Sequence, residues 1–279
     1  MDSGTTPQAP SDSSPAPVPV PALAQALAPA PASAPAAGPS DGGGPAHIVW
    51  DWNGTLLHDI DVVLEATNAC FAELDLPQLT LEQYREMFCV PIPAFYERVL
   101  GRRPGEEEYV RMDAAFHRHY FSRAARAGLA EGAAELLVSW GEDGGTHSLC
   151  SLAPHQRLRS WVSELGIDGH FVRVDGDAGH GPRTGKARQM ARHVAALAGV
   201  DRSRTVVIGD ATDDALAAAH AGVRAVLHTG GSHSRGSLEA AGVPVVDSLA
   251  EAVSLAAELV RRPVAPGPGP RRGTPSEQR

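Results

Sequence analysis

The sequence predicts an α/β fold, with a Rossmann-like, mostly parallel sheet as the core and a helical cap domain inserted into it. Two observations carry this prediction. Between about 47 and 262, short runs rich in β-branched residues alternate with longer segments of helical periodicity. One interval, 59–130, is helical throughout and interrupts this alternation. With 279 residues, 43% of them apolar, the chain is long enough to bury a core.

Five strands and several helices are expected in the core. The strand candidates are 47–51 (HIVWD), 147–151 (HSLCS), 171–174 (FVRV), 205–209 (TVVIG) and 224–228 (RAVLH). Apolar residues at helical spacing over 158–165, closed by Gly166, and over 190–197 predict helices after the second and third strands. The capping-box pattern at 248–251 (SLAE) predicts the start of the last helix. Alternating strands and helices imply right-handed crossovers, so helices should cover both faces of the sheet.

The inserted interval is expected to form a helical cap. It contains a helical face between 60 and 74, a capping box from Thr80 to Gln83, two prolines ahead of a short helix, and a longer helix over 106–126. The interval leaves the sheet directly after the first strand. Because ligands of open α/β sheets bind at the carboxyl ends of strands, a cap in this place would cover such a site. We therefore assign 47–58 and 131–262 to the core and 59–130 to the cap.

The two ends of the chain differ in composition from the middle. Residues 1–46 contain eleven prolines, twelve alanines and no basic residue, which predicts a disordered tail. Residues 263–279 are rich in Pro, Gly and Arg and predict a second tail. The stretch VPALAQALA has the small residues of a secretory cleavage site, but it lacks a positive segment before it and prolines interrupt it. We therefore expect no signal peptide.

Charge and cysteine content exclude several classes of protein. The net charge is −9 without a basic cluster in the central region, so we expect no nucleic acid as a partner. No run approaches the roughly 18 apolar residues of a membrane-spanning helix, so we expect no membrane insertion. The three cysteines are widely spaced and odd in number, which favours a reduced, soluble, cytoplasmic protein.

Residues able to carry chemistry gather where the predicted strands end. The first strand leads into Asp51-Trp52-Asn53-Gly54-Thr55, the second ends in Ser151, and the fourth leads into Gly209-Asp210-Ala211-Thr212-Asp213-Asp214. Lys186, the only lysine in the chain, precedes the fourth strand. Asp51 and Asp210 on adjacent strands would repel each other, and a shared Mg²⁺ would stabilise both. Lys186 and the Ser151 hydroxyl would then bind phosphoryl oxygens, while one carboxylate attacks phosphorus.

In this order the elements resemble the haloacid dehalogenase superfamily, and within it the phosphoglycolate phosphatase-like branch. The inserted helices are similar to the family's cap. The resemblance implies that Asp51 is the nucleophile and a metal ligand, and that the main-chain carbonyl of Asn53 and the carboxylate of Asp210 complete the protein's share of Mg²⁺ ligands. It further implies that Asp214 binds the metal directly or through water. The implied phosphate-binding residues are Gly54, Thr55, Ser151 and Lys186. Asp213 could equally cap a helix.

One position departs from the family's pattern. Phosphatases of the family carry a second aspartate where this chain has Asn53, and that aspartate protonates the leaving oxygen and then activates water. An amide cannot exchange a proton at neutral pH, so slow turnover or a preference for acidic leaving groups is expected. His58 and Asp59 are the nearest candidates for a replacement, although both could be ordinary polar residues.

The sequence thus predicts a Mg²⁺-dependent phosphatase that hydrolyses a small phosphorylated metabolite through an aspartyl phosphate on Asp51. The alternative is a phosphate- and metal-binding regulatory protein of the same fold, weakened by Asn53. A receiver domain also places acids and a lysine at strand ends, but the large insertion argues against it. The substrate is left open among phosphoglycolate, sugar phosphates and nucleotides, and the oligomeric state is not indicated. Candidate selectivity residues in the cap are Tyr96, Arg98, Arg102, Arg103 and His117.

Overall fold

The computed structural model describes residues 44–179 and 185–261, and these contain a six-stranded parallel sheet. The strand order is β5-β4-β1-β6-β7-β8. The strands are β1 (His47–Trp50), β4 (Thr146–Pro154), β5 (Phe171–Asp177), β6 (Thr205–Gly209), β7 (Arg224–His228) and β8 (Val245–Val246). Trp50 in β1 lies beside Leu149 in β4 and Ile208 in β6. The segments that follow these three strands therefore meet at one edge of the sheet. The predicted α/β fold class is confirmed.

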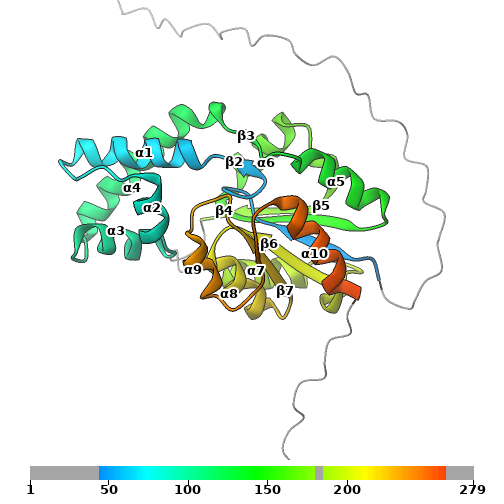
Figure 1. Ribbon diagram of the computed structural model, residues 1–279. Helices are drawn as coiled ribbons and strands as arrows, with labels where there is room; N and C mark the ends of the chain where they lie inside the picture. Colours follow the sequence, from blue (N-terminus) through cyan, green and yellow to red (C-terminus); the bar gives the residue numbers. More distant parts are fainter. Residues whose placement is uncertain (1–43, 180–184, 262–279) are drawn as a thin grey trace, which may run out of the picture. The chain divides into compact units, whose positions relative to one another are not determined.

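Helices cover both faces of this sheet (Figure 1). One face packs against α5 (Ala133–Glu142), α6 (His155–Glu164) and α10 (Leu249–Arg261). The other packs against α7 (Ala187–Ala195), α8 (Thr212–Ala221) and α9 (Arg235–Glu239). Successive side chains of a strand point to opposite faces, so Ile48 and Trp50 join the first core and Val49 joins the second. Short 3-10 turns lie at Asp168–His170 and Arg202–Arg204.

A helical insertion follows β1. A two-stranded antiparallel ribbon, β2 (Leu57–His58) with β3 (Gly128–Leu129), joins its two ends. Between these strands lie α1 (Ile60–Glu73), α2 (Leu81–Met87), α3 (Ile92–Leu100), α4 (Glu106–Arg123) and the 3-10 turn Ala124–Arg126. These helices enclose a hydrophobic cluster of their own, which includes Phe71, Tyr84, Phe95 and Met112. A separate core is what a compact cap requires.

The local signals in the sequence locate helix ends well. Thr80 and Gln83 form the expected reciprocal capping box at the start of α2. Gly166 has φ of 69° just after α6, a conformation that glycine adopts without strain. At α10, the Glu251 amide donates to Ser248 Oγ at 3.2 Å. The predicted helix starts and stops at these places are confirmed.

Several predicted boundaries are wrong. β4 continues past Ser151 to Pro154, because its pairing with β5 is irregular after Cys150 and resumes at Pro154, beside Asp177. β5 extends to Asp177 for the same reason. β1 ends at Trp50 rather than 51, and the long helix predicted over 106–126 ends at Arg123, where the 3-10 turn begins. The two-residue strands β2, β3 and β8 were not predicted, since two residues show no periodicity.

The predicted tails lie outside the described residues, apart from 44–46. Within the described ranges no helix is both long and apolar enough to cross a membrane. The three cysteines are unpaired, as expected; Cys70 and Cys150 are buried and Cys89 is partly exposed.

Candidate active site

Four charged side chains from distant parts of the chain meet at the carboxyl edge of the sheet. Asp51 follows β1, Asp210 follows β6, Asp214 lies in the first turn of α8, and Lys186 directly precedes α7. All four are buried, with exposed fractions between 0% and 7%. The three carboxylates each present an oxygen within 4.8 Å of the others. The structure thus brings together the acids and the lysine that the sequence singled out, and we call them the acidic cluster and its lysine.

Lys186 is held tightly among the acids. Its ammonium donates to Asp51 Oδ1 and, at 2.5 Å, to Asp214 Oδ1. Its main-chain amide donates to Asp213 Oδ2 at 2.7 Å. The role left open for Asp213 is therefore to position the lysine's main chain, whereas Asp214 caps α8 by accepting the Ala211 amide at 3.1 Å.

The cluster has more negative than positive charge. Three buried carboxylates face a single ammonium, so full ionisation leaves two uncompensated negative charges in a site with little water. Burial, together with the charge of Asp214, raises the pKa of Asp51 well above its usual range and that of Asp210 to about 6. Burial alone would lower the pKa of Lys186, but the charges of Asp214 and Asp51 raise it well above normal. The lysine remains charged while the carboxylates lack a counter-charge.

A divalent cation would supply the positive charge that the three carboxylates lack. Ligands on opposite sides of Mg²⁺ lie about 4 Å apart, since each Mg–O bond is about 2.1 Å long. Carboxylate oxygens within 4.8 Å of one another approach that spacing. The charge of a divalent ion equals the uncompensated charge of the cluster, and oxygen donors are what Mg²⁺ prefers. Asp51, Asp210 and Asp214 are thus able to hold the ion.

Glycines allow the chain to approach Asp210 closely. Gly54 has φ of 72°, and a Cβ atom there would lie 2.5 Å from Asp210 Oδ2. A Cβ atom at Gly231 would lie 2.0 Å from the same oxygen. Ser232, the next residue, donates its amide to Asp210 Oδ2 at 2.6 Å. The Asp210 carboxylate therefore lies between two main-chain segments that no larger residue could form.

The predicted phosphate-binding hydroxyls lie around this cluster with different partners. Thr55 is fully buried, and its hydroxyl makes a weak contact of 3.5 Å with Asp210 Oδ1. Ser151 is also buried and accepts the Ala153 amide at 3.0 Å on its hydroxyl oxygen. That bond leaves the Ser151 hydroxyl proton available as a donor.

Asn53 is bonded to residues outside the acidic cluster. Its side-chain Nδ2 donates to Asp59 Oδ2 at 2.7 Å and to the Tyr120 hydroxyl at 2.8 Å. The turn after β1 is closed by amides of Gly54 and Leu57, which donate to the carbonyls of Leu57 and Trp52. Neither of these bonds uses the Asn53 carbonyl, the predicted metal ligand.

The two residues considered as replacements for the missing acid differ in their surroundings. His58 is exposed in β2, whereas Asp59 is 1% exposed beside Asn53. Burial raises the pKa of Asp59, while the hydrogen bonds from Tyr120 and Asn53 oppose that rise.

The loop after β7 and helix α2 meet beside the cluster. Arg85 in α2 donates Nε to the Gly231 carbonyl at 2.9 Å, and the Ser234 amide donates to the Arg85 carbonyl at 3.1 Å. His233 is 2% exposed there, with its ring 5.2 Å from that of Phe88. Its ring lies near the Asp210 carbonyl, yet neither ring nitrogen completes a hydrogen bond within the described part of the chain.

The predicted selectivity residues of the insertion divide into exposed and buried side chains. Arg102 and Arg103 are exposed, and Arg102 forms a two-bond ion pair with Glu108 at 2.7 Å. Tyr96 is buried inside the insertion. Arg98 donates to the Met87 carbonyl at 3.2 Å and is close enough to His233 to lower its pKa, after the larger effect of burial. His117 contacts the Asp113 carbonyl at 2.8 Å. Of this set, only Arg98 approaches the loop after β7.

Sequence reasoning missed Arg85, Tyr120, Ser232 and His233. Each lies in a segment without a recognisable motif, and each approaches the strand ends only through tertiary contacts. The neighbouring Gly-Gly pair at 230–231, next to Ser and His, was the one available signal.

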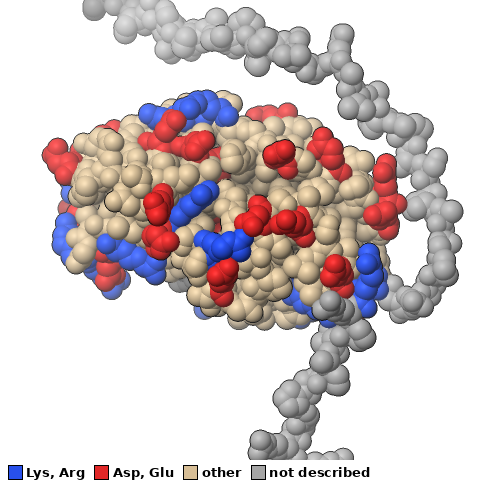
Figure 2. Space-filling model, in the orientation of Figure 1, with Lys and Arg blue, Asp and Glu red and all other residues tan. Residues whose placement is uncertain are grey.

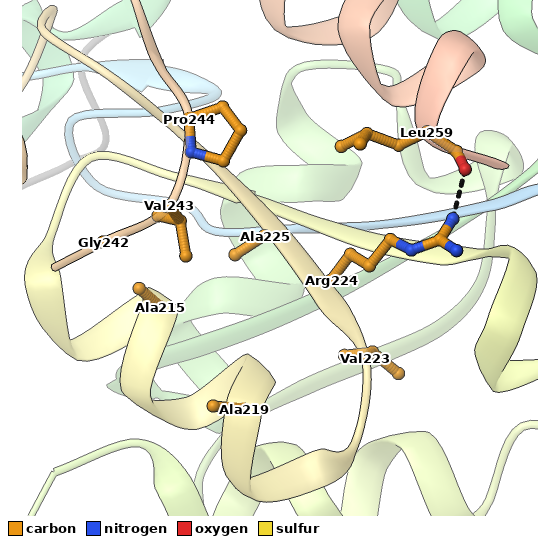
Figure 3. Close-up of a pocket in the computed structure, with 9 residues that line it drawn as sticks. All are labelled: Ala215, Ala219, Val223, Arg224, Ala225, Gly242, Val243, Pro244 and Leu259. Carbon is orange, nitrogen blue, oxygen red and sulfur yellow. Dashed lines mark hydrogen bonds between the residues drawn. The ribbon is translucent and has the colours of Figure 1, made fainter. Parts of the chain in front are cut away.

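Within residues 44–179 and 185–261, no second group of three or more acidic, histidine or cysteine side chains converges in this way. A mostly apolar hollow is lined by residues of α8, β7 and α10, and its Arg224 donates to the Leu259 carbonyl (Figure 3). Its lining includes Arg224 at the start of β7 but none of the residues of the acidic cluster. On the face seen in Figure 2, basic and acidic side chains are interspersed. The acidic cluster is therefore the site that we interpret.

Comparisons with known proteins agree with this geometry. The profile of a family described as haloacid dehalogenase-like hydrolase matches residues 45–222, which is more than half of the chain. A phosphoglycolate phosphatase of Cereibacter sphaeroides is 27% identical over 188 residues, covering 66% of this chain and 85% of its own length. Phosphoglycolate phosphatase 1 of Pseudomonas aeruginosa is 26% identical over 227 residues, covering 77% and 82%.

A solved structure described as a predicted phosphatase from Clostridium acetobutylicum aligns with a TM-score of 0.67 over 77% of this chain and 99% of its own. At 16% identity it supports the fold alone. The family match over more than half of the sequence shows that the chain belongs to the haloacid dehalogenase-like hydrolases.

Proposed function

We propose that this hydrolase is a Mg²⁺-dependent phosphatase that cleaves a small phosphorylated metabolite through an aspartyl phosphate on Asp51. One observation carries the proposal: three buried carboxylates converge beside one ammonium and lack the counter-charge of a divalent ion. When bound there, Mg²⁺ would neutralise the carboxylates and the phosphoryl oxygens. Asp51, Asp210, Asp214 and the main-chain carbonyl of Asn53 would hold it.

The chemical step assigns different tasks to the two oxygens of Asp51. Lys186 is bonded to Oδ1, so Oδ2 is the oxygen we assign to attack on phosphorus. Attack forms the Oδ2–P bond while the bond from phosphorus to the ester oxygen breaks, and the leaving oxygen takes up a proton. Water then attacks the same phosphorus and gives up a proton to solvent while the Oδ2–P bond breaks, which releases inorganic phosphate and regenerates the Asp51 carboxylate. The Lys186 ammonium and the Ser151 hydroxyl would stabilise the phosphoryl oxygens in both steps.

Asn53 limits which esters react quickly. Its amide can donate a hydrogen bond but not a proton. Solvent must therefore protonate the leaving oxygen in the first step, and the attacking water of the second step must lose its proton without a base at position 53. General acid-base help accounts for about 10²- to 10⁴-fold in rate. We therefore propose that esters with acidic alcohols react faster than esters with basic ones.

The relatives suggest a first substrate, and the loop after β7 offers a place for its leaving group. The curated relatives are named phosphoglycolate phosphatases, so phosphoglycolate is the first substrate to test. We place the leaving group beside His233, whose neutral imidazole can donate one hydrogen bond and accept another. Burial lowers its pKa to about 4 against the opposing charge of Asp214, so it is neutral at pH 7.

Phosphate release by the full chain tests the proposal. Phosphoglycolate and a series of aryl phosphates would be incubated with Mg²⁺ or with a chelator, and Asp51→Asn would serve as the inactive comparison. We expect Mg²⁺-dependent release that is lost in Asp51→Asn and that falls as the pKa of the leaving alcohol rises. Release without metal, or equal release by Asp51→Asn, would refute the mechanism.

A regulatory protein of the same fold is the second candidate, and Asn53 is the observation that favours it. Such a protein would bind Mg²⁺ and inorganic phosphate without turnover. Calorimetric binding of both, together with no release even at high protein concentration, would establish this alternative.

A further inference from the structure

The side chain of Asn53 belongs to a closed triangle of hydrogen bonds. Asn53 Nδ2 donates to Asp59 Oδ2 at 2.7 Å and to the Tyr120 hydroxyl at 2.8 Å, and that hydroxyl donates to Asp59 Oδ2 at 2.7 Å. We propose that Asp59 and Tyr120 are positioning residues for Asn53, and that position 53 must carry an amide for as long as position 59 carries a carboxylate. The catalytic part of this inference rests on the proposed phosphatase function.

The direction of each bond follows from the chemistry of the groups. An ionised carboxylate only accepts hydrogen bonds, so the amide nitrogen of Asn53, not its oxygen, must face Asp59. The amide oxygen is thereby fixed on the other side of the amide group. A carboxylate at position 53 would have no proton to offer Asp59, and two buried carboxylates would lie in contact.

Asp59 is fixed in place by further contacts, so it determines whether position 53 can carry an amide or a carboxylate. Its other oxygen, Oδ1, accepts the Gly54 amide at 2.8 Å, and its exposed fraction is 1%. It immediately precedes α1, where the insertion begins, while Tyr120 comes from α4 within the insertion. The triangle therefore ties the catalytic turn after β1 to both the entry and a later helix of the insertion. Comparing position 53 alone with the family's pattern would reveal only the loss of an aspartate, and not its pairing with position 59.

Exchanging the two residue types should restore the triangle. In a chain carrying Asn53→Asp and Asp59→Asn, the new amide at 59 can donate to the new carboxylate at 53, and Tyr120 can donate to that carboxylate as well. The amide oxygen at 59 can still accept the Gly54 amide. Each single change, in contrast, leaves either two facing carboxylates or two facing amides.

Thermal unfolding of four full-length chains, the wild type, Asn53→Asp, Asp59→Asn and the double variant, tests the pairing without reference to activity. In chelator at pH 8, we expect Asn53→Asp to lower Tm by at least about 5 °C and the double variant to return to within about 2 °C of the wild type, which is a measurable difference for a domain of this size. Asp61→Asn removes the same charge from an exposed position two residues further along and should have little effect. An Asn53→Asp chain as stable as the wild type, or a double variant whose loss equals the sum of the single losses, would overturn the pairing.

Kinetics test the positioning role. With an aryl phosphate of basic leaving group, the double variant should gain about 10²-fold in kcat over the wild type, because it places a proton donor at position 53, while Asn53→Asp alone should gain far less. Tyr120→Phe should lower kcat about tenfold and leave KM nearly unchanged, since it loses the hydrogen bond to the charged Asp59 carboxylate and the one from the Asn53 amide. Equal gains in the single and double variants, or an unchanged kcat in Tyr120→Phe, would overturn the role. If no chain hydrolyses any ester, the phosphatase proposal fails, while the unfolding data still decide the pairing.

Discussion

Asp210→Asn is expected to make the metal-free protein more stable while abolishing its response to Mg²⁺. Asp210 is 2% exposed and shares its surroundings with the carboxylates of Asp51 and Asp214. An asparagine of nearly the same shape can still accept the Ser232 amide, which now donates to Asp210 at 2.6 Å. The substitution therefore removes a charge and keeps the main hydrogen bond.

The magnitude follows from the pKa of Asp210. Burial, followed by the charge of Asp214, raises this pKa from 3.8 to about 6. The folded state thus binds the proton more tightly than the unfolded state, so stability falls as pH rises from about 4 to about 6 and stays low above that range. At about 1.4 kcal/mol for each pH unit, ionised Asp210 costs about 3 kcal/mol near neutral pH. Asparagine should recover between about 1 and 3 kcal/mol of this, because its amide does not fit every contact of the carboxylate.

Urea unfolding at pH 5 and pH 7.5, with chelator or with Mg²⁺, measures the effect. In chelator at pH 7.5 we expect Asp210→Asn to be more stable than the wild type, and the difference should shrink at pH 5. Mg²⁺ should stabilise the wild type and leave the variant almost unchanged, because ion binding to the folded state alone produces that stabilisation. The exposed Asp61→Asn variant is the control for a lost charge. A destabilised Asp210→Asn chain in chelator, or an undiminished response to Mg²⁺, would refute the charge-deficit argument.

Three further predictions concern other parts of the molecule. Gly54→Ala should abolish turnover and lower Tm, because the new methyl group would lie 2.5 Å from Asp210 Oδ2 at a φ of 72°; phosphate release and Tm close to wild-type values would contradict this. Burial lowers the pKa of His47 to about 3 and that of His147 to about 4, so both stay neutral when folded. These two histidines should therefore lower stability as pH drops below 6.5, by about 2 kcal/mol each at pH 5, and urea unfolding of Asp210→Asn, which lacks the opposing contribution of Asp210, should show this fall more clearly than the wild type. His233→Ala should raise KM for the small ester more than it lowers kcat, whereas His220→Ala on the exposed side of α8 should change neither; equal KM values for the two variants would remove His233 from the substrate site.

Much of the fold could be read from local patterns. Strand runs such as 205–209 consist of β-branched residues between turn signals, and the capping residues Thr80 and Ser248 satisfy amides only three positions away. These features depend on neighbours along the chain, so no knowledge of packing is needed. The ends of β4 and β5 could not be placed in this way, because they depend on pairing between strands with an irregular register.

The candidate site also has some features that are visible in the sequence and others that depend on the fold. Residue order along the chain was enough to show that acids follow β1 and β6, that a solitary lysine precedes α7, and that an amide stands at position 53. The three-dimensional fold was needed to show that Lys186 bonds both Asp51 and Asp214, that Ser232 and Gly231 enclose Asp210, and that Tyr120 and Asp59 are hydrogen-bonded to Asn53. The reason is physical: these partners are separated by up to 135 residues along the chain, and their meeting depends on sheet order and helix packing, which local residue patterns do not encode.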